Sequence, residues 1–154
     1  IDSNKIFSSG MSLGGFMSYR LACELEEINS IGSVTGSMAG YYQCNPPKKS
    51  SIIHLHGMND AVVPYNGVEW SFSAKAAHDF WKNHNQCNSQ NELTMPDFNG
   101  DGEYTKRLIS YDCEENKSVE LYSLEGEGHT WWKKSWGHDI NTSELIWQFF
   151  QSQQ

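Results

Sequence analysis

Short apolar runs, separated by polar and turn-forming stretches, predict four β-strands in this chain. Runs rich in Ile, Val, Phe and Leu and bounded by Gly, Ser, Pro or Asn are typical of strands inside a sheet. They occupy residues 5–9, 28–35, 51–56 and 118–124. The first run begins at Lys5 and ends at Ser9, directly before a glycine.

Helical spacing of apolar residues predicts three helices between and after these strands. Apolar positions recur every three or four residues in 13–26, in 69–84 and after Asn141, a predicted helix N-cap. Residues 88–115 are polar and turn-rich and are expected to form an irregular excursion. Because strands and helices alternate, we predict an α/β fold, a parallel sheet flanked by helices, in one domain over residues 1–154.

The first predicted strand leads into a turn with a serine between glycines. Gly10-Met11-Ser12-Leu13-Gly14 fits the G-x-S-x-G pattern in its required strand-turn-helix context. A Cβ at Gly10 or Gly14 is expected to clash with backbone in this strained turn. Ser12 is therefore the predicted nucleophile, and the N–H of Leu13 a predicted oxyanion-hole donor; the alternative is a Ser/Gly-rich turn without a catalytic role.

A serine hydroxyl needs a base within reach and an acid that orients the base. Asp60 directly follows the third predicted strand, at the edge of a parallel sheet where ligand sites occur. His129 follows the fourth strand in a glycine-rich loop. The order serine, acid, histidine is the one this arrangement requires. We predict Asp60 as the acid and His129 as the general base; Asp60 could instead only cap a turn.

The other histidines have less favourable positions. His138 is the second choice for the base. The remaining four are interpreted as packing or surface residues: His54, His56, His78 and His84.

Two patterns that suggest metal sites are incomplete. His54 and His56 point to one face of a strand, but no carboxylate or cysteine nearby completes a zinc set. Residues 97–102 imitate the start of a calcium loop, yet Leu108 stands where its bidentate glutamate belongs. We therefore expect a solvated turn there, no metal and no cofactor.

Composition narrows the possible partners. With 38% hydrophobic and 13% aromatic residues, the 154-residue chain is expected to fold as a globular domain. Its net charge of −8 disfavours nucleic acid and anionic lipid, and no apolar stretch approaches the ~20 residues that span a bilayer. We expect neither nucleic acid nor membrane as a partner.

Four cysteines allow two disulfides in three possible pairings, and free buried thiols are the alternative. The cysteines are Cys23, Cys44, Cys87 and Cys113.

Taken together, these motifs resemble the polyhydroxybutyrate depolymerase and feruloyl esterase family of secreted α/β-hydrolases. The matching segments lie in order along nearly the whole chain. They are Ile1-Asp2, Gly10-Met11-Ser12, Gly14-Gly15, Met17 to Cys23, His54-Leu55-His56-Gly57 through Asp60 to Val63-Pro64-Tyr65, Gly128-His129-Thr130-Trp131, and Glu144-Leu145-Ile146-Trp147. One position departs from the pattern: Trp132 stands where such proteins commonly have proline.

The resemblance implies a serine esterase with Ser12, Asp60 and His129 as its triad. Expected substrates are small esters or polyesters, namely hydroxyalkanoate or short acyl and aryl esters; the alternatives are feruloyl or acetyl esters of carbohydrates, or a noncatalytic fragment. An extracellular or periplasmic setting, also implied, would let cysteines oxidise. We then predict the pairs Cys87–Cys113 and Cys23–Cys44, which close local loops.

Such enzymes carry further strands before the nucleophile strand, with a loop that supplies a second oxyanion donor. From the resemblance we expect those N-terminal strands to be missing from this sequence, which would leave the strand from Lys5 to Ser9 as an open edge. An open edge is a template for pairing. We expect a homodimer or a separate partner chain to cover it.

Overall fold

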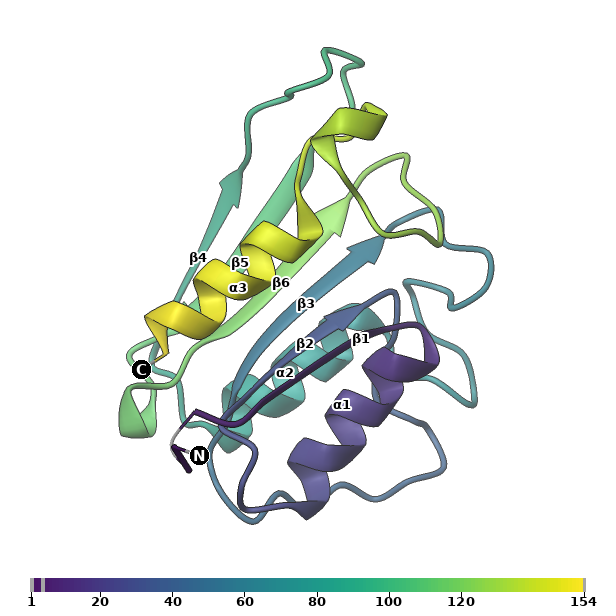
Figure 1. The fold of residues 1–154 in the computed structure, drawn as a ribbon. Helices are drawn as coiled ribbons and strands as arrows, with labels where there is room; N and C mark the ends of the chain where they lie inside the picture. The colour runs from purple at the N-terminus through teal and green to yellow at the C-terminus, as the bar shows by residue number, and fades with distance from the viewer. Residues whose placement is uncertain (1, 4, 154) are drawn as a thin grey trace.

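One six-stranded sheet organises the chain in the computed structural model, which describes residues 2, 3 and 5–153 (Figure 1). The strand order is β1-β2-β3-β6-β5-β4. The strands are β1 (Phe7–Met11), β2 (Ser30–Val34), β3 (Ser51–Gly57), β4 (Ser89–Thr94), β5 (Thr105–Tyr111) and β6 (Val119–Leu124). The helices are α1 (Leu13–Glu24), α2 (Ala74–His84) and α3 (Thr142–Ser152), with short 3-10 turns η1 (Glu114–Asn116) and η2 (Lys134–Trp136).

The sheet is mixed, which corrects the expectation of a parallel sheet. β1, β2, β3 and β6 are parallel, as predicted, but β5 runs antiparallel to β6 and β4 antiparallel to β5. These two strands form a hairpin within residues 88–115, where an irregular excursion was expected. Every residue of β4 after its first is exposed, so this strand carries no apolar run from which it could be predicted.

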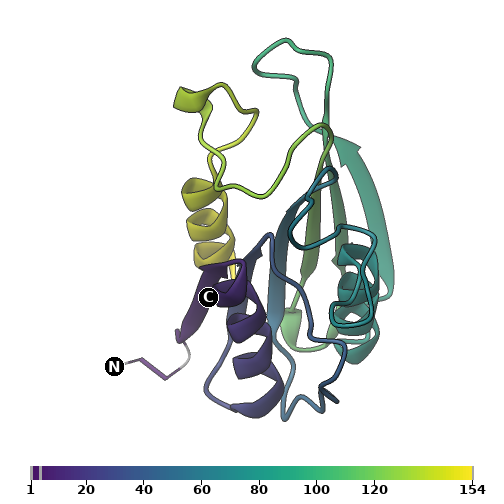
Figure 2. The same cartoon turned by 90° about the vertical axis from the view of Figure 1, so that its right-hand side faces the viewer.

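Helices cover both faces of the sheet. α1 and α2 lie on one face and α3 lies on the other (Figures 1 and 2). Neighbouring residues of β3 illustrate the two layers, because Ile52 faces α1 and α2 while Ile53 faces α3. The observed sheet and helices fit an α/β fold.

Helix starts agree with the sequence only in part. α2 begins at Ala74, later than the predicted residue 69, and Ser73 caps it by accepting a hydrogen bond from the N–H of Ala76. α3 begins after Asn141, as predicted. However, the Asn141 side chain caps no helical N–H; it accepts from the N–H of Lys134 instead.

Two disulfides link the elements, and both have the predicted pairing. Cys23–Cys44 joins the last turn of α1 to the loop before β3, and Cys87–Cys113 joins the start of the β4-β5 hairpin to its end. Neither closes more than a local segment, with sequence separations of 21 and 26 residues. Among residues 2, 3 and 5–153, no helix has both the length and the hydropathy of a membrane-spanning segment.

Candidate active site

Ser12 occupies the turn between β1 and α1 in a backbone conformation that side chains rarely adopt. Its φ is 55° and its ψ is −118°. The turn is held on both sides: the Ser12 N–H donates to the Val34 carbonyl at 2.8 Å, and the Ser12 carbonyl accepts from the N–H of Gly15 at 2.9 Å. Non-glycine residues persist in such regions only where the surrounding structure enforces them, and they cluster at functional sites.

Close packing at this turn leaves no room for a Cβ at three glycines. A Cβ on Gly10 would lie 2.5 Å from the carbonyl carbon of Gly14, as the sequence predicts. A Cβ on Gly15 would overlap the hydroxyl of Ser33, and one on Gly36 would overlap the carbonyl oxygen of Ser12. The expectation for Gly14 is wrong, since a Cβ there would meet nothing within 4 Å. The crowded side of the turn faces β2.

Asp60 lies three residues after β3, and its carboxylate is completely buried. One carboxylate oxygen, Oδ1, accepts hydrogen bonds from the N–H groups of Val62 at 2.8 Å and Val63 at 2.9 Å. Part of the sequence alternative, a turn-forming aspartate, is therefore also correct. The second oxygen, Oδ2, remains for other partners.

His129 is brought to Asp60 by contact between two loops. The N–H of Asn59 donates to the Glu127 carbonyl at 2.9 Å, and Gly57 leaves no room for a side chain between its own backbone and the carbonyls of Glu127 and Gly128. Nδ1 of His129 then lies 2.8 Å from Oδ2 of Asp60. Because an ionised carboxylate only accepts, Nδ1 carries the proton and Nε2 is free to accept one.

The structure brings Asp60 and His129 together and places Ser12 at the same edge of the sheet. All three follow the carboxyl ends of parallel strands, Ser12 after β1, Asp60 after β3 and His129 after β6. Among the hydrogen bonds of the described residues, none joins Ser12 to His129. Hydrogen bonds of catalytic groups are often long in unliganded enzymes.

Leu13, the predicted oxyanion donor, is the first residue of α1. Its N–H belongs to the helix turn that has no intrahelical acceptors, where the helix dipole favours negative charge. The Leu13 side chain is 82% exposed and therefore points to solvent instead of into the core.

His138, the second choice for the base, faces a different carboxylate. Its Nδ1 lies 2.5 Å from Oε1 of Glu127. The other oxygen of Glu127 accepts a hydrogen bond from the indole of the buried Trp132 at 3.0 Å. His138 thus has Glu127 as its carboxylate partner, and Trp132, which stands where the resembled family commonly has proline, hydrogen bonds to the same carboxylate.

His54 and His56 are more than packing residues. Both are fully buried in β3 and are hydrogen bonded to each other, Nε2 to Nδ1, at 2.9 Å. Burial lowers the pKa of His56 and lowers that of His54 well below its usual value. The sequence signals this pair only through its spacing of two residues on one face of a strand.

No group of three or more metal-ligating side chains forms within residues 2, 3 and 5–153. In the 97–102 loop, the Asp97 carboxylate accepts from the N–H groups of Gly100 at 2.6 Å and Gly102 at 3.0 Å. The loop thus satisfies its own acidic groups as a turn.

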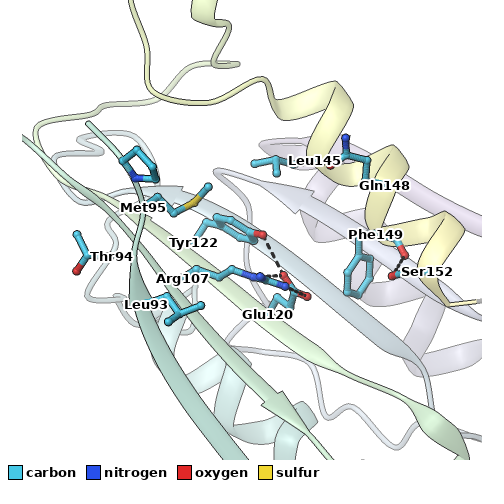
Figure 3. A pocket seen from close by; sticks show the side chains of 11 residues that line it. Leu93, Thr94, Met95, Arg107, Glu120, Tyr122, Leu145, Gln148, Phe149 and Ser152 are labelled. Atoms are coloured by element: carbon cyan, nitrogen blue, oxygen red, sulfur yellow. Dashed lines mark hydrogen bonds and ion pairs between the residues drawn. The ribbon is translucent and has the colours of Figure 1, made fainter. Parts of the chain in front are cut away.

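A groove of about 460 Å³ lies between α3 and the hairpin strands (Figure 3). Its floor holds an ion pair in which Arg107 donates to both oxygens of Glu120, at 2.8 and 2.7 Å. Tyr122 donates to the same carboxylate at 3.0 Å, and burial raises the pKa of this phenol. None of the three triad candidates lines the groove.

Comparison with known proteins identifies several esterases. The chain is 28% identical to a probable feruloyl esterase C of Aspergillus niger over 99% of the chain, and 26% identical to feruloyl esterase D of Neurospora crassa over 97%. It is 23% identical, over 84% of its length, to a bifunctional acetylxylan esterase/xylanase of Neocallimastix patriciarum. No protein-family model matches.

The chain resembles esterases throughout its length. It spans about half the length of the two feruloyl esterases, 52% and 49%, and 18% of the bifunctional protein. These similarities support membership of an esterase family and carboxylic ester hydrolysis as the chemistry of that family.

Proposed function

We propose that this chain is the nucleophile-bearing portion of a serine esterase with the α/β-hydrolase fold, forming one partial domain over residues 1–154. The observation that carries the proposal is the pairing of Asp60 with His129 at the sheet edge where Ser12 occupies a strained turn. Esterase relatives along the whole chain support the same chemistry.

Catalysis would proceed by acyl transfer. Oγ of Ser12 attacks the ester carbonyl carbon while Nε2 of His129 accepts the hydroxyl proton, and Asp60 stabilises the resulting imidazolium. The carbon–oxygen bond to the alcohol then breaks, and His129 returns the proton to the leaving alkoxide. In the second half, water gives a proton to Nε2 of His129 and its oxygen attacks the acyl carbon. The bond between that carbon and Oγ of Ser12 then breaks, His129 returns the proton to Oγ, and the carboxylic acid is released. No cofactor takes part.

The oxyanion would be held by the N–H of Leu13 and by a second donor outside this chain. Loss of one such donor typically costs about 10² to 10³ in turnover. The isolated chain should therefore react slowly even with an aligned triad. A noncatalytic fragment is the competing proposal, and it predicts that Ser12 does not react at all.

The substrate class we favour is the feruloyl or acetyl ester of a carbohydrate. The relatives are named for feruloyl and acetylxylan esters, which supports this choice over the hydroxyalkanoate esters that the sequence first suggested. Two disulfides support an extracellular location, because disulfides persist in oxidising compartments.

Covalent labelling tests the proposal. A fluorophosphonate probe should modify Ser12 in the intact chain, with Ser12→Ala as the control, and mass analysis of peptides locates the adduct. Turnover of methyl ferulate, acetylated xylan and a hydroxybutyrate oligomer then ranks the substrate classes. An unlabelled Ser12 would contradict the serine esterase and favour the noncatalytic fragment.

A further inference from the structure

A buried chain of hydrogen bonds runs from helix α1 to the acid loop. The hydroxyl of Tyr19 lies 3.0 Å from Nδ1 of His54, and Nε2 of His54 lies 2.9 Å from Nδ1 of His56. Nε2 of His56 then lies 2.8 Å from the Val63 carbonyl oxygen and 3.4 Å from Oδ2 of Asp60. The three side chains from Tyr19 to His56 are at most 1% exposed.

The Val63 carbonyl, the last acceptor in this series of hydrogen bonds, determines where each proton lies. A carbonyl only accepts, so Nε2 of His56 carries a hydrogen, and the Nδ1 of a neutral His56 must accept. His54 therefore donates through its Nε2 and accepts at Nδ1, which leaves the Tyr19 hydroxyl as the donor. Burial lowers the pKa of both imidazoles and raises that of the Tyr19 phenol, so all three groups stay neutral. One set of tautomers satisfies every contact.

His56 donates this fixed N–H to the acid loop and lies next to the carboxylate of that loop. Oδ1 of Asp60 is already held by the N–H groups of Val62 and Val63. The His56 N–H donates to the carbonyl of Val63 at 2.8 Å, and its Nε2 lies 3.4 Å from Oδ2 of Asp60, the oxygen that also faces Nδ1 of His129. The acid loop is thus contacted by His56 of β3, in addition to the hydrogen bonds that the loop makes within itself.

These hydrogen bonds also reach α1, the helix that directly follows the predicted nucleophile, Ser12. Tyr19 lies in α1, whose first residue directly follows Ser12, and its ring meets that of His54 edge-on with centroids 5.7 Å apart. A pair of imidazoles in a core is costly unless hydrogen bonded, and apolar residues of similar volume would fill the space without that cost. These polar groups therefore call for a role other than packing.

We propose that His56 is a positioning residue, oriented by Tyr19 through His54, that holds the Asp60 carboxylate in line with His129. The proposal rests on the function proposed above, in which Asp60 orients the catalytic base. His56 touches no substrate; it acts through Asp60. Nothing in the sequence pattern alone distinguishes it from a core histidine.

Paired substitutions at position 56 separate positioning from packing. His56→Leu fills the site without an N–H, whereas His56→Gln can return an amide N–H near the position of Nε2. Misplacement of a catalytic group by 1 Å can cost about 10²-fold, so His56→Leu should slow fluorophosphonate labelling of Ser12 by up to this factor. It should lower kcat more than it raises KM, and His56→Gln should recover most of the loss.

NMR of the imidazole protons provides a measurement independent of activity. In the unaltered chain we expect a downfield Nδ1 proton on His129, hydrogen bonded to Asp60, and its loss or faster exchange in His56→Leu. Tyr19→Phe, which removes one hydroxyl, should shift the Nε2 proton of His56. His84→Gln is the control, because His84 bonds to the Lys48 carbonyl before β3, at the other end of the sheet.

The proposal would be overturned by a folded His56→Leu variant in which two readouts are unchanged: the NMR shift and exchange of the His129 Nδ1 proton, and the rate at which the probe labels Ser12. If His56→Leu does not fold, Tyr19→Phe decides, and unchanged NMR shifts of the His56 Nε2 and His129 Nδ1 protons in that variant would overturn the proposal. A normal set of imidazole shifts in a chain whose Ser12 never reacts would contradict the esterase function while leaving the positioning contact established.

Discussion

Nδ1 of His129 lies 2.8 Å from Oδ2 of Asp60 although 69 residues separate the two in the sequence. Three features produce this contact: the adjacency of β3 and β6, the missing side chain at Gly57, and two N–H donors on the other oxygen of Asp60. Oδ2 is thus left to accept from the imidazole of His129, with Nε2 of His56 3.4 Å away.

Loss of the nucleophile or the base should remove activity without unfolding the chain. Ser12→Ala and His129→Ala are each expected to abolish ester hydrolysis and probe labelling, while circular dichroism stays close to that of the unaltered chain. The matched control is His138→Ala, since His138 pairs with Glu127 instead. Activity that survives in His129→Ala but disappears in His138→Ala would show that the base is His138.

Asp60→Asn should cost about 10⁴ in kcat, because an amide N–H facing His129 favours the wrong imidazole tautomer. The amide oxygen can still accept from the N–H groups of Val62 and Val63, so loop geometry should be retained. Steady-state kinetics on an aryl ester measure the effect. An unchanged kcat would exclude Asp60 from the mechanism.

Alanine substitutions at three glycines should have effects of opposite sign. Gly10→Ala and Gly36→Ala place a Cβ against backbone atoms at the Ser12 turn and should lower the free energy of unfolding. Gly14→Ala meets open space within helix α1 and should raise it by about 0.5–1 kcal/mol. Urea denaturation compares the three. Equal destabilisation at Gly14 and Gly10 would contradict the observed packing of the turn.

Stability should fall as the pH drops below about 6.5. Burial lowers the pKa of His54, His56 and His78 below their usual 6.5, so the unfolded chain binds protons there that the folded chain does not. Unfolding then becomes easier by up to about 1.4 kcal/mol per pH unit for each such histidine. Urea midpoints between pH 5 and 8 measure the slope, which His54→Gln should reduce. A stability independent of pH in this range would contradict neutral burial.

The open edge of β1 should be covered in the functional protein. Within the described residues β1 pairs only with β2, and Phe7 stacks on Phe150 of α3 beside this edge. The chain spans about half the length of the two feruloyl esterases, so each relative has a further segment of similar size. We propose that a strand from a corresponding segment pairs with the open edge of β1.

Hydrogen exchange at Phe7 and Ser9, with solution scattering on the chain, tests this proposal. Slow exchange in the presence of that segment and fast exchange without it would support the proposal. Protection that rises with concentration would indicate a homodimer instead. A monomer with the edge unprotected under both conditions would contradict any partner at β1.

The sequence by itself determined the elements whose signal is local. Apolar runs predicted the four parallel strands, because strands that line a core carry apolar residues. The G-x-S-x-G turn predicted Ser12, and Gly10 is the glycine of this motif that backbone crowding requires. Chain order then selected Asp60 and His129 as the acid and base to test. The disulfide pairs followed from local loop closure together with the oxidising setting that the family resemblance implied.

Only the tertiary structure decided what depends on neighbours distant in sequence. The exposed hairpin strand β4 is stabilised by pairing with β5 and has no apolar pattern of its own. Gly36 matters because β2 ends against the Ser12 turn, and His54 matters because Tyr19 lies over it. Such contacts cannot be predicted from one strand or helix, since a side chain's hydrogen-bond partners are set by which elements the fold places beside it.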